Sequence, residues 1–115
     1  MSENCIFCKI AAGTIATQLL YQDELVLAFP DIAPQAPVHV LVIPRRHIAS
    51  LELLTEADRA EMGHLLERTA HVAGQLGLQA GYRTIINTNA HGGQEVFHLH
   101  LHILGGKPIG PMVAR

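Results

Sequence analysis

Three histidines alternate with leucines near the end of the chain, in the order His98-Leu99-His100-Leu101-His102. Because side chains alternate across a β-strand, a strand here places the three imidazoles on one face and the leucines on the other. Imidazoles grouped in this way support two chemistries. They can bind Zn²⁺ and leave a position open for an activated water. Alternatively, one neutral imidazole attacks phosphorus while its neighbours orient it and move protons.

A second group of chemically active side chains lies at the start of the chain, where Cys5 and Cys8 have a Cys-x-x-Cys spacing. Two cysteines at this spacing supply half of the four ligands of a structural zinc site. A closed site therefore needs two more ligands, from histidines or carboxylates. The alternative is a pair of reduced thiols packed in the core. A thioredoxin-like redox role is less favoured, because no predicted strand leads into this segment.

The composition favours one compact domain spanning residues 1–115, with 49% hydrophobic residues and a formal net charge of −2. Lysines and arginines are scattered apart from Arg45-Arg46, so the sequence does not predict binding to a nucleic acid polymer. No apolar run suggests a secretory signal or a membrane span, and we therefore expect a cytoplasmic protein. The apolar share is high for a short chain, which is consistent with a subunit interface.

Local patterns predict the elements that position these groups. We expect a short helix over 5–12, strands over 19–22, 26–29, 38–43, 82–87 and 96–104, an ordered loop over 31–37 and a turn over 91–94. One long helix begins at a cap formed by Thr55 and Asp58 and ends at Gly77. Irregular alternation of these elements indicates an α+β fold with an antiparallel sheet.

A few other polar residues receive simpler interpretations. His39 is the one polar residue of the central strand 38–43, so it should be buried or face a pocket. His64 and His71 on the long helix, and the pair Arg45-Arg46, are expected to face solvent.

The histidine run, together with the segments 87–94 (Asn-Thr-Asn-Ala-His-Gly-Gly-Gln) and 31–39 (Asp-Ile-Ala-Pro-Gln-Ala-Pro-Val-His), closely resembles the histidine-triad (HIT) superfamily. Within it, the chain is most similar to the Hint-type purine nucleoside phosphoramidases of bacteria. The resemblance covers nearly the whole chain. It implies a five-stranded antiparallel sheet with one long and one short helix, joined into a continuous sheet across a homodimer. It also implies hydrolysis of purine nucleoside 5′-phosphoramidates, or related nucleotidyl conjugates, with no cofactor required for catalysis.

The resemblance assigns roles residue by residue. His100 corresponds to the nucleophile that forms a nucleotidyl-histidine intermediate, and His102 to the group that contacts the phosphate and aids the leaving group. His98 and His39 correspond to residues that orient the nucleophile and relay protons. The implied nucleotide-binding residues, besides His100 and His102, are Asp31, Ile32, Asn87, Gly93, Gln94, Glu95 and Val96.

Some of these assignments have local alternatives. Asp31 could cap its own loop in an Asx turn, and Gly92-Gly93 could form an ordinary turn. Many relatives carry a hydroxyl residue at the position of Glu95. Glu95 is therefore included in the site because of its position, and no role in binding is assigned to it.

The resemblance also suggests the two missing zinc ligands. Some triad proteins with this Cys-x-x-Cys bind zinc through it together with a histidine after the proline-basic segment, here His47, and the first triad histidine, here His98. Two other functions remain open from the sequence: a nucleotide-binding regulatory protein with incidental turnover, and a zinc-dependent hydrolase that uses the triad as ligands.

Overall fold

The computed structural model describes residues 4–114. Its strands are β1 (Tyr21–Gln22), β2 (Val26–Pro30), β3 (Val38–Pro44), β4 (Tyr82–Ile85) and β5 (Leu101–Gly105). Its helices are α1 (Ile6–Ala11), α2 (Arg59–Gln75) and α3 (Asn89–Gly92), with 3-10 turns over Leu51–Leu53 and Glu56–Asp58. None of the described helices has the length and apolarity needed to cross a membrane.

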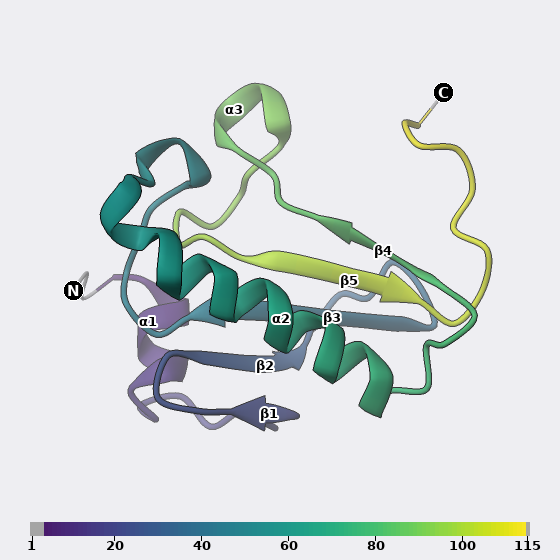
Figure 1. Cartoon of the computed structure of the whole chain (residues 1–115), viewed down its shortest axis with the longest axis horizontal. Helices are drawn as coiled ribbons and strands as arrows, with labels where there is room; N and C mark the ends of the chain where they lie inside the picture. Colours follow the sequence, from purple (N-terminus) through teal and green to yellow (C-terminus); the bar gives the residue numbers. More distant parts are fainter. Residues whose placement is uncertain (1–3, 115) are drawn as a thin grey trace.

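The strands form one antiparallel sheet in the order β1-β2-β3-β5-β4, across which the long helix α2 runs (Figure 1). The predicted α+β fold with one long helix is therefore confirmed. The β3–β5 pairing sets Leu41 opposite His102 and His39 opposite Leu104. His39 and His102 are thus diagonal neighbours on one face of the sheet, within reach of each other's side chains.

Strands β2 and β3 are buried on both faces because α1 and α2 pack on opposite sides of the sheet. The face toward α2 joins Leu65 and Val72 of the helix to strand residues Val40, Val42, Leu101 and Ile103, and to Leu99. The face toward α1 joins Phe7, Cys8 and Ile10 to Leu27, Phe29, Leu41 and Ile43. Alternate residues of β2 and β3 serve the two cores, which is why both strands read as continuous apolar runs.

The strand predicted over 96–104 is wrong at its start, because β5 begins only at Leu101. Before that point the backbone leaves the ladder, and the Leu99 N–H donates instead to the carbonyl of Ile48 at 2.7 Å. The strand predicted over 82–87 likewise ends early, at Ile85. The strand predicted over 19–22 shortens to the two residues of β1.

The first half of the turn predicted over 91–94 belongs instead to the short helix α3, which ends at Gly92 and is capped by Gly93. Gly93 adopts a φ of 79°, in the left-handed region where a glycine cap is favoured. The capping interaction of Thr55 with Asp58 is confirmed. It precedes a 3-10 turn, however, and α2 itself begins at Arg59.

Two side chains expected to face solvent are instead tied to the β1–β2 turn. His64 lies 2.7 Å from a carboxylate oxygen of Asp23, and Arg45 donates to the carbonyls of Asp23 and Ala11. Asp23 also accepts from the backbone N–H of Leu25. Although partial burial opposes it, hydrogen bonds from Tyr21, Leu25, Val26 and His64 hold the pKa of Asp23 well below its usual value. This turn is therefore fixed by polar contacts that no local pattern indicates.

Candidate active site

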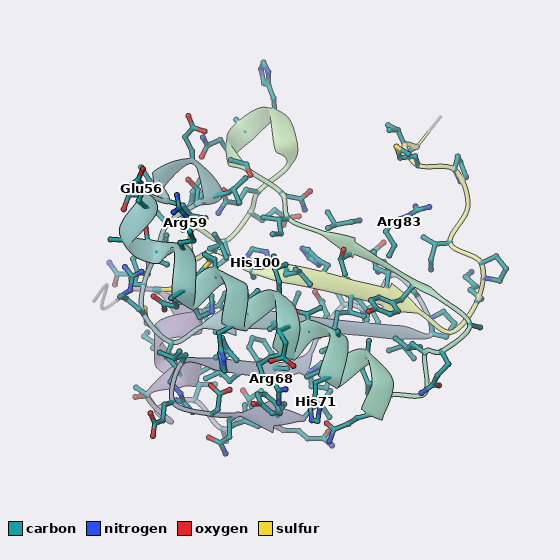
Figure 2. The ribbon with its side chains drawn as sticks, in the orientation of Figure 1. Glu56, Arg59, Arg68, His71, Arg83 and His100 are labelled. Carbon is teal, nitrogen blue, oxygen red and sulfur yellow. The ribbon has the colours of Figure 1, made fainter. Side chains whose placement is uncertain are left out.

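His98, His100 and His102 face the α1 side of the sheet, as the alternation predicts. The leucines between them lie in the core beneath α2. His98 is fully buried and His100 is 7% exposed. Figure 2 shows His100 beside β5. The ring of Phe7 on α1 meets the rings of both His98 and His100 edge-on, at centroid distances of 5.8 and 5.1 Å. The strand-like backbone therefore delivers the imidazoles to a common space next to α1.

His100 has a defined tautomer. Its Nδ1 lies 2.8 Å from the carbonyl oxygen of His98. A carbonyl oxygen can only accept a hydrogen bond, so Nδ1 carries the proton and Nε2 carries the lone pair. A neutral imidazole with an available lone pair is a competent nucleophile.

A chain of hydrogen bonds fixes the tautomers of His39 and His102 in the same way. The Gln35 N–H donates to His39 Nδ1 at 3.0 Å, so the proton of neutral His39 lies on Nε2. That atom donates to His102 Nδ1 at 2.9 Å. The proton of neutral His102 therefore lies on its own Nε2, which is buried and has no hydrogen-bond partner among the described residues. Burial first, and then the neighbouring His100 and His39, lower the pKa of His102 to about 4.

Asp31 approaches the middle of this hydrogen-bonded series, with one carboxylate oxygen 3.5 Å from the same His39 Nε2 that donates to His102. Its other oxygen accepts from the Ala33 N–H at 2.8 Å, which is the loop-capping contact considered as an alternative. Asp31, His39 and His102 could in principle hold a metal ion, because their ligand atoms lie within 4.8 Å of one another. A metal on His39 Nε2 would, however, make His39 an anion, since Nδ1 already accepts a hydrogen bond. The geometry therefore favours a proton relay over a metal site.

A cavity of about 780 Å³ opens beside these histidines. Its polar lining consists of His39, His100 and His102 together with Asp31, Asn87, Gly93 and Glu95. Of the other predicted nucleotide-binding residues, Ile32 and Val96 also line it, and Ile32 is 98% exposed. Among the described lining residues there is no lysine or arginine, whereas two are carboxylates. An anionic group bound there would depend on neutral hydrogen-bond donors.

Of the residues predicted for catalysis or nucleotide binding, Gln94 and His98 do not line this cavity. Gln94 is buried, and its side chain accepts from the Asn89 N–H and donates to the carbonyls of Ala49 and Val96. These hydrogen bonds hold in place the loop that contains Gly93. His98 is fully buried and contacts the cysteines and Pro44 instead.

The apolar part of the cavity lining could not be located from the sequence. It consists of Ile6, Phe7 and Ile10 of α1, together with Phe29 and Leu41. Apolar side chains of this kind suit contact with a planar ring. The available signal was the spacing of Ile6, Phe7 and Ile10, which places them on one side of a short helix.

The predicted zinc ligands Cys5, Cys8, His47 and His98 come together on the other side of His100. Their ligand atoms lie within 4.8 Å of one another. His98 Nδ1 is 3.3 Å from Cys5 Sγ and 3.5 Å from Cys8 Sγ, and His47 Nδ1 is 3.3 Å from Cys8 Sγ. In tetrahedral zinc sites neighbouring ligand atoms are about 3.3 to 3.8 Å apart, as the usual Zn–S and Zn–N bond lengths require.

The protonation of His98 also suits a metal ligand. Its Nε2 lies 2.8 Å from the carbonyl oxygen of Pro44, so Nε2 carries the proton and Nδ1 presents its lone pair to the two sulfur atoms. Burial is the main reason that the pKa of His98 is lowered, which also keeps the ring neutral. The four residues therefore fit a zinc ion.

Comparison with known proteins agrees with this arrangement. The HIT domain family model matches residues 12–109. The chain is 47% identical over 115 residues to the purine nucleoside phosphoramidase of Escherichia coli, covering 99% of this chain and 97% of the relative. It is 52% identical over 109 residues to an uncharacterized HIT-like protein of Synechococcus elongatus, covering 95% and 96% of the two chains.

Two solved structures are similar over almost their whole length. A HIT family hydrolase from Clostridium thermocellum superposes with a TM-score of 0.94 at 43% identity, covering 99% of this chain and 100% of that one. A histidine triad protein from Clostridium difficile gives a TM-score of 0.94 at 41% identity, covering 98% and 99%. The fold, the arrangement of the histidines and these relatives together show that the chain belongs to the HIT domain family.

Proposed function

We propose that this protein is a hydrolase that cleaves purine nucleoside 5′-phosphoramidates, or related nucleotidyl conjugates, through a nucleotidyl intermediate on His100. One observation carries the proposal: the lone pair of His100 Nε2 and the proton of His102 Nε2 belong to adjacent rings, with centroids 5.0 Å apart, on the wall of one cavity. Cleavage of a P–N bond needs a nucleophile at phosphorus and a proton at nitrogen together.

In the first step, the lone pair of His100 Nε2 forms a bond to phosphorus and the P–N bond breaks. The departing nitrogen takes the proton of His102 Nε2 and leaves as a neutral amine. Phosphorylation places positive charge on the His100 ring, and the hydrogen bond from its Nδ1–H to the His98 carbonyl strengthens as that charge develops.

The same positive charge offsets the negative charge left on His102. The His39 Nε2–H, which donates to His102 Nδ1, also stabilises that negative charge. In the second step, water transfers a proton to His102 Nε2 and its oxygen attacks phosphorus. The bond to His100 then breaks and a nucleoside monophosphate is released. Over the cycle one water is consumed, and both histidines return to their starting tautomers.

The cavity supports the choice of substrate class. Its apolar lining residues, from α1 and Phe29, suit contact with a flat base, and the Asp31 carboxylate in the same lining can accept hydrogen bonds from ribose hydroxyls. The polar part of the lining has neutral donors and two acidic side chains, Asp31 and Glu95. This charge balance favours the single negative charge of a phosphoramidate over the multiple charges of a nucleoside triphosphate.

The proposal is tested by assaying adenosine 5′-phosphoramidate hydrolysis with the wild type, His100→Asn and His71→Asn. His71 is the matched control, because its ring packs against Tyr21 and lies well apart from His100 in Figure 2. We expect the wild type and His71→Asn to release ammonia and nucleotide at equal rates and His100→Asn to be inactive. Tight nucleotide binding without turnover in the wild type would instead indicate a regulatory nucleotide-binding protein.

We further propose that Cys5, Cys8, His47 and His98 hold a structural zinc ion. Four protein ligands leave no position for a catalytic water, so the ion would tie α1 to the sheet. Catalysis in this proposal uses no metal, because the lone pair of His98 faces the sulfur atoms and that of His100 faces the cavity. The lone pairs of His98 and His100 therefore point to different places and cannot both coordinate one metal ion bound by the triad.

A homodimer with a continuous sheet is also proposed. β4 is an edge strand, with β5 on one side and no partner strand among residues 4–114 on the other. An unpaired edge is the surface through which two sheets can join. Analytical ultracentrifugation of the wild type over a range of concentrations tests this: we expect a species of twice the mass of the chain, and a monomer at all concentrations would contradict the proposal.

A further inference from the structure

The segment that carries His98 and His100 is not part of the strand ladder. β5 begins at Leu101, and the Leu99 N–H donates to Ile48 O. Regular strand pairing therefore does not fix the backbone of His98, although its carbonyl oxygen determines the tautomer of the proposed nucleophile. Other contacts of this segment must supply the missing restraint.

The side chain of His98 makes contacts of this kind. It is fully buried, donates from Nε2 to Pro44 O at 2.8 Å, and directs Nδ1 at the sulfur atoms of Cys5 and Cys8. The His47 ring packs against the His98 ring edge-on, with centroids 5.1 Å apart. Both ring nitrogens of His98 thus have partners in a buried setting, where losing a partner is costly.

The same helix that carries the cysteines also touches the nucleophile. Phe7 lies between Cys5 and Cys8 on α1, and its ring meets both the His98 and the His100 rings. A change in how the cysteines meet His98 would therefore reach His100 by two routes. One route is the His98 carbonyl, and the other is the Phe7 ring.

We propose that the cluster of Cys5, Cys8, His47 and His98 positions the His100 nucleophile, through the backbone carbonyl of His98. The cysteines and His47 touch no reacting atom and act as positioning residues. The proposal applies whether the sulfur atoms meet His98 directly or through a bound metal, because in both cases Nδ1 of His98 is held. It rests on the proposed function only in calling His100 the nucleophile.

The test uses the full-length protein with ¹⁵N-labelled imidazoles in three forms: wild type, Cys5→Ser/Cys8→Ser, and Val72→Ala. Val72 is buried in the core on the α2 face, so Val72→Ala lowers stability without touching the cluster. In the wild type and in Val72→Ala, we expect His100 to show one protonated Nδ1 and one unprotonated Nε2. In the double serine variant, the two ¹⁵N shifts should move toward each other as the tautomers mix.

Kinetics on the same proteins should separate positioning from binding. Because small displacements of a reacting group can slow a reaction by about 100-fold, we expect kcat of the double serine variant to fall by about 10- to 100-fold, with KM within about twofold. Val72→Ala should keep the wild-type kcat below its melting temperature. If the double serine variant does not fold, His47→Gln, which keeps both cysteines, should show the same changes in smaller degree.

A folded variant that keeps the wild-type His100 ¹⁵N shifts and kcat would overturn the inference. Mixed tautomers in the variant, with no phosphoramidate hydrolysis by the wild type, would support the positioning role and overturn the proposed function.

Discussion

The Nδ1–H of His100 donates to the carbonyl oxygen of His98, two residues earlier, at 2.8 Å. This single contact leaves a lone pair on the nitrogen that faces the cavity. A parallel contact, from His39 Nε2 to His102 Nδ1, leaves a proton on His102 Nε2. The two imidazoles thus present a lone pair and a proton, which in our proposal serve as the nucleophile and the acid, and they are distinguished only by their hydrogen-bond partners.

The proposed role of His102 as the acid predicts a dependence on the leaving group. In His102→Gln, turnover of an adenosine phosphoramidate should fall by about 10²- to 10⁴-fold, the usual contribution of a general acid. Turnover of the p-nitrophenyl ester of the same nucleotide should fall much less, because nitrophenolate leaves without protonation. Steady-state assays of both substrates test this. Equal losses would remove His102 from the proton-donor role.

The lowered pKa of His102 predicts how stability changes with pH. Its pKa is about 4 in the folded protein, whereas the ordinary pKa of an exposed histidine is 6.5, so the unfolded chain binds more protons between these pH values. The free energy of unfolding should therefore fall as the pH drops from 6.5 toward 4. His102 should account for about 1 to 3 kcal/mol of this fall, a range that allows for partial solvent screening.

Urea unfolding at about pH 7 and about pH 4.5 measures the effect, because most of the difference in proton binding by His102 lies between these two pH values. His102→Gln should reduce the loss of stability at low pH, while His71→Asn, an exposed histidine, should leave it unchanged. Some loss should remain in His102→Gln, because the pKa of His98 is also lowered by burial. The same pH dependence in His102→Gln as in the wild type would contradict this account.

Asp31 should discriminate ribose from deoxyribose. Asp31→Asn keeps an oxygen that can accept from the Ala33 N–H, so the loop should be retained. Binding of adenosine monophosphate should weaken by about 10- to 100-fold, since a hydrogen bond to a charged group contributes about 1.5 to 3 kcal/mol. Binding of the 2′- and 3′-deoxy analogues should weaken less. Calorimetry on these ligands decides the point, and equal losses would exclude Asp31 from contact with the ribose.

Several of these features could be predicted from the sequence, because they depend on local periodicity. Alternation placed the three histidines on one face, and the Thr55–Asp58 spacing located the start of the long helical region. Other features depend on contacts between distant segments. The pairing of β3 with β5 brings His39 to His102, and strand order is not encoded in the pattern of either strand. The packing of α1 against the sheet likewise brings Ile6, Phe7 and Ile10 into the lining of the cavity.

The start of β5 shows why boundaries were harder to predict. The residues from Val96 to His100 have the alternation of a strand, but Leu99 bonds to Ile48 and Phe97 is 49% exposed. Side chains still alternate in direction along this segment, so that His98 points toward the cysteines and Leu99 into the core. The hydrogen-bonding partner of a backbone, unlike the face of a side chain, is set by tertiary structure.

The metal content of the purified protein tests the zinc proposal. Protein purified without added metal should contain about one zinc per chain, the stoichiometry of a four-ligand site, as measured by elemental analysis. Cys5→Ser/Cys8→Ser should contain none and melt at a lower temperature. Absence of zinc from the wild type, with unchanged stability of the double variant, would mean that the thiols only pack in the core.

The central claim is that His100 forms a covalent bond to phosphorus during turnover. Rapid quenching of the wild type into alkaline denaturant, with substrate labelled at the nucleotide phosphate, tests it most directly, because phosphorus–imidazole bonds survive base better than acid. We predict label on the peptide that contains His100, appearing before free nucleotide and lost as product accumulates, and no label in His100→Asn. Wild-type protein that turns over without acquiring label, or a His100→Asn variant that acquires label and turns over, would contradict the account.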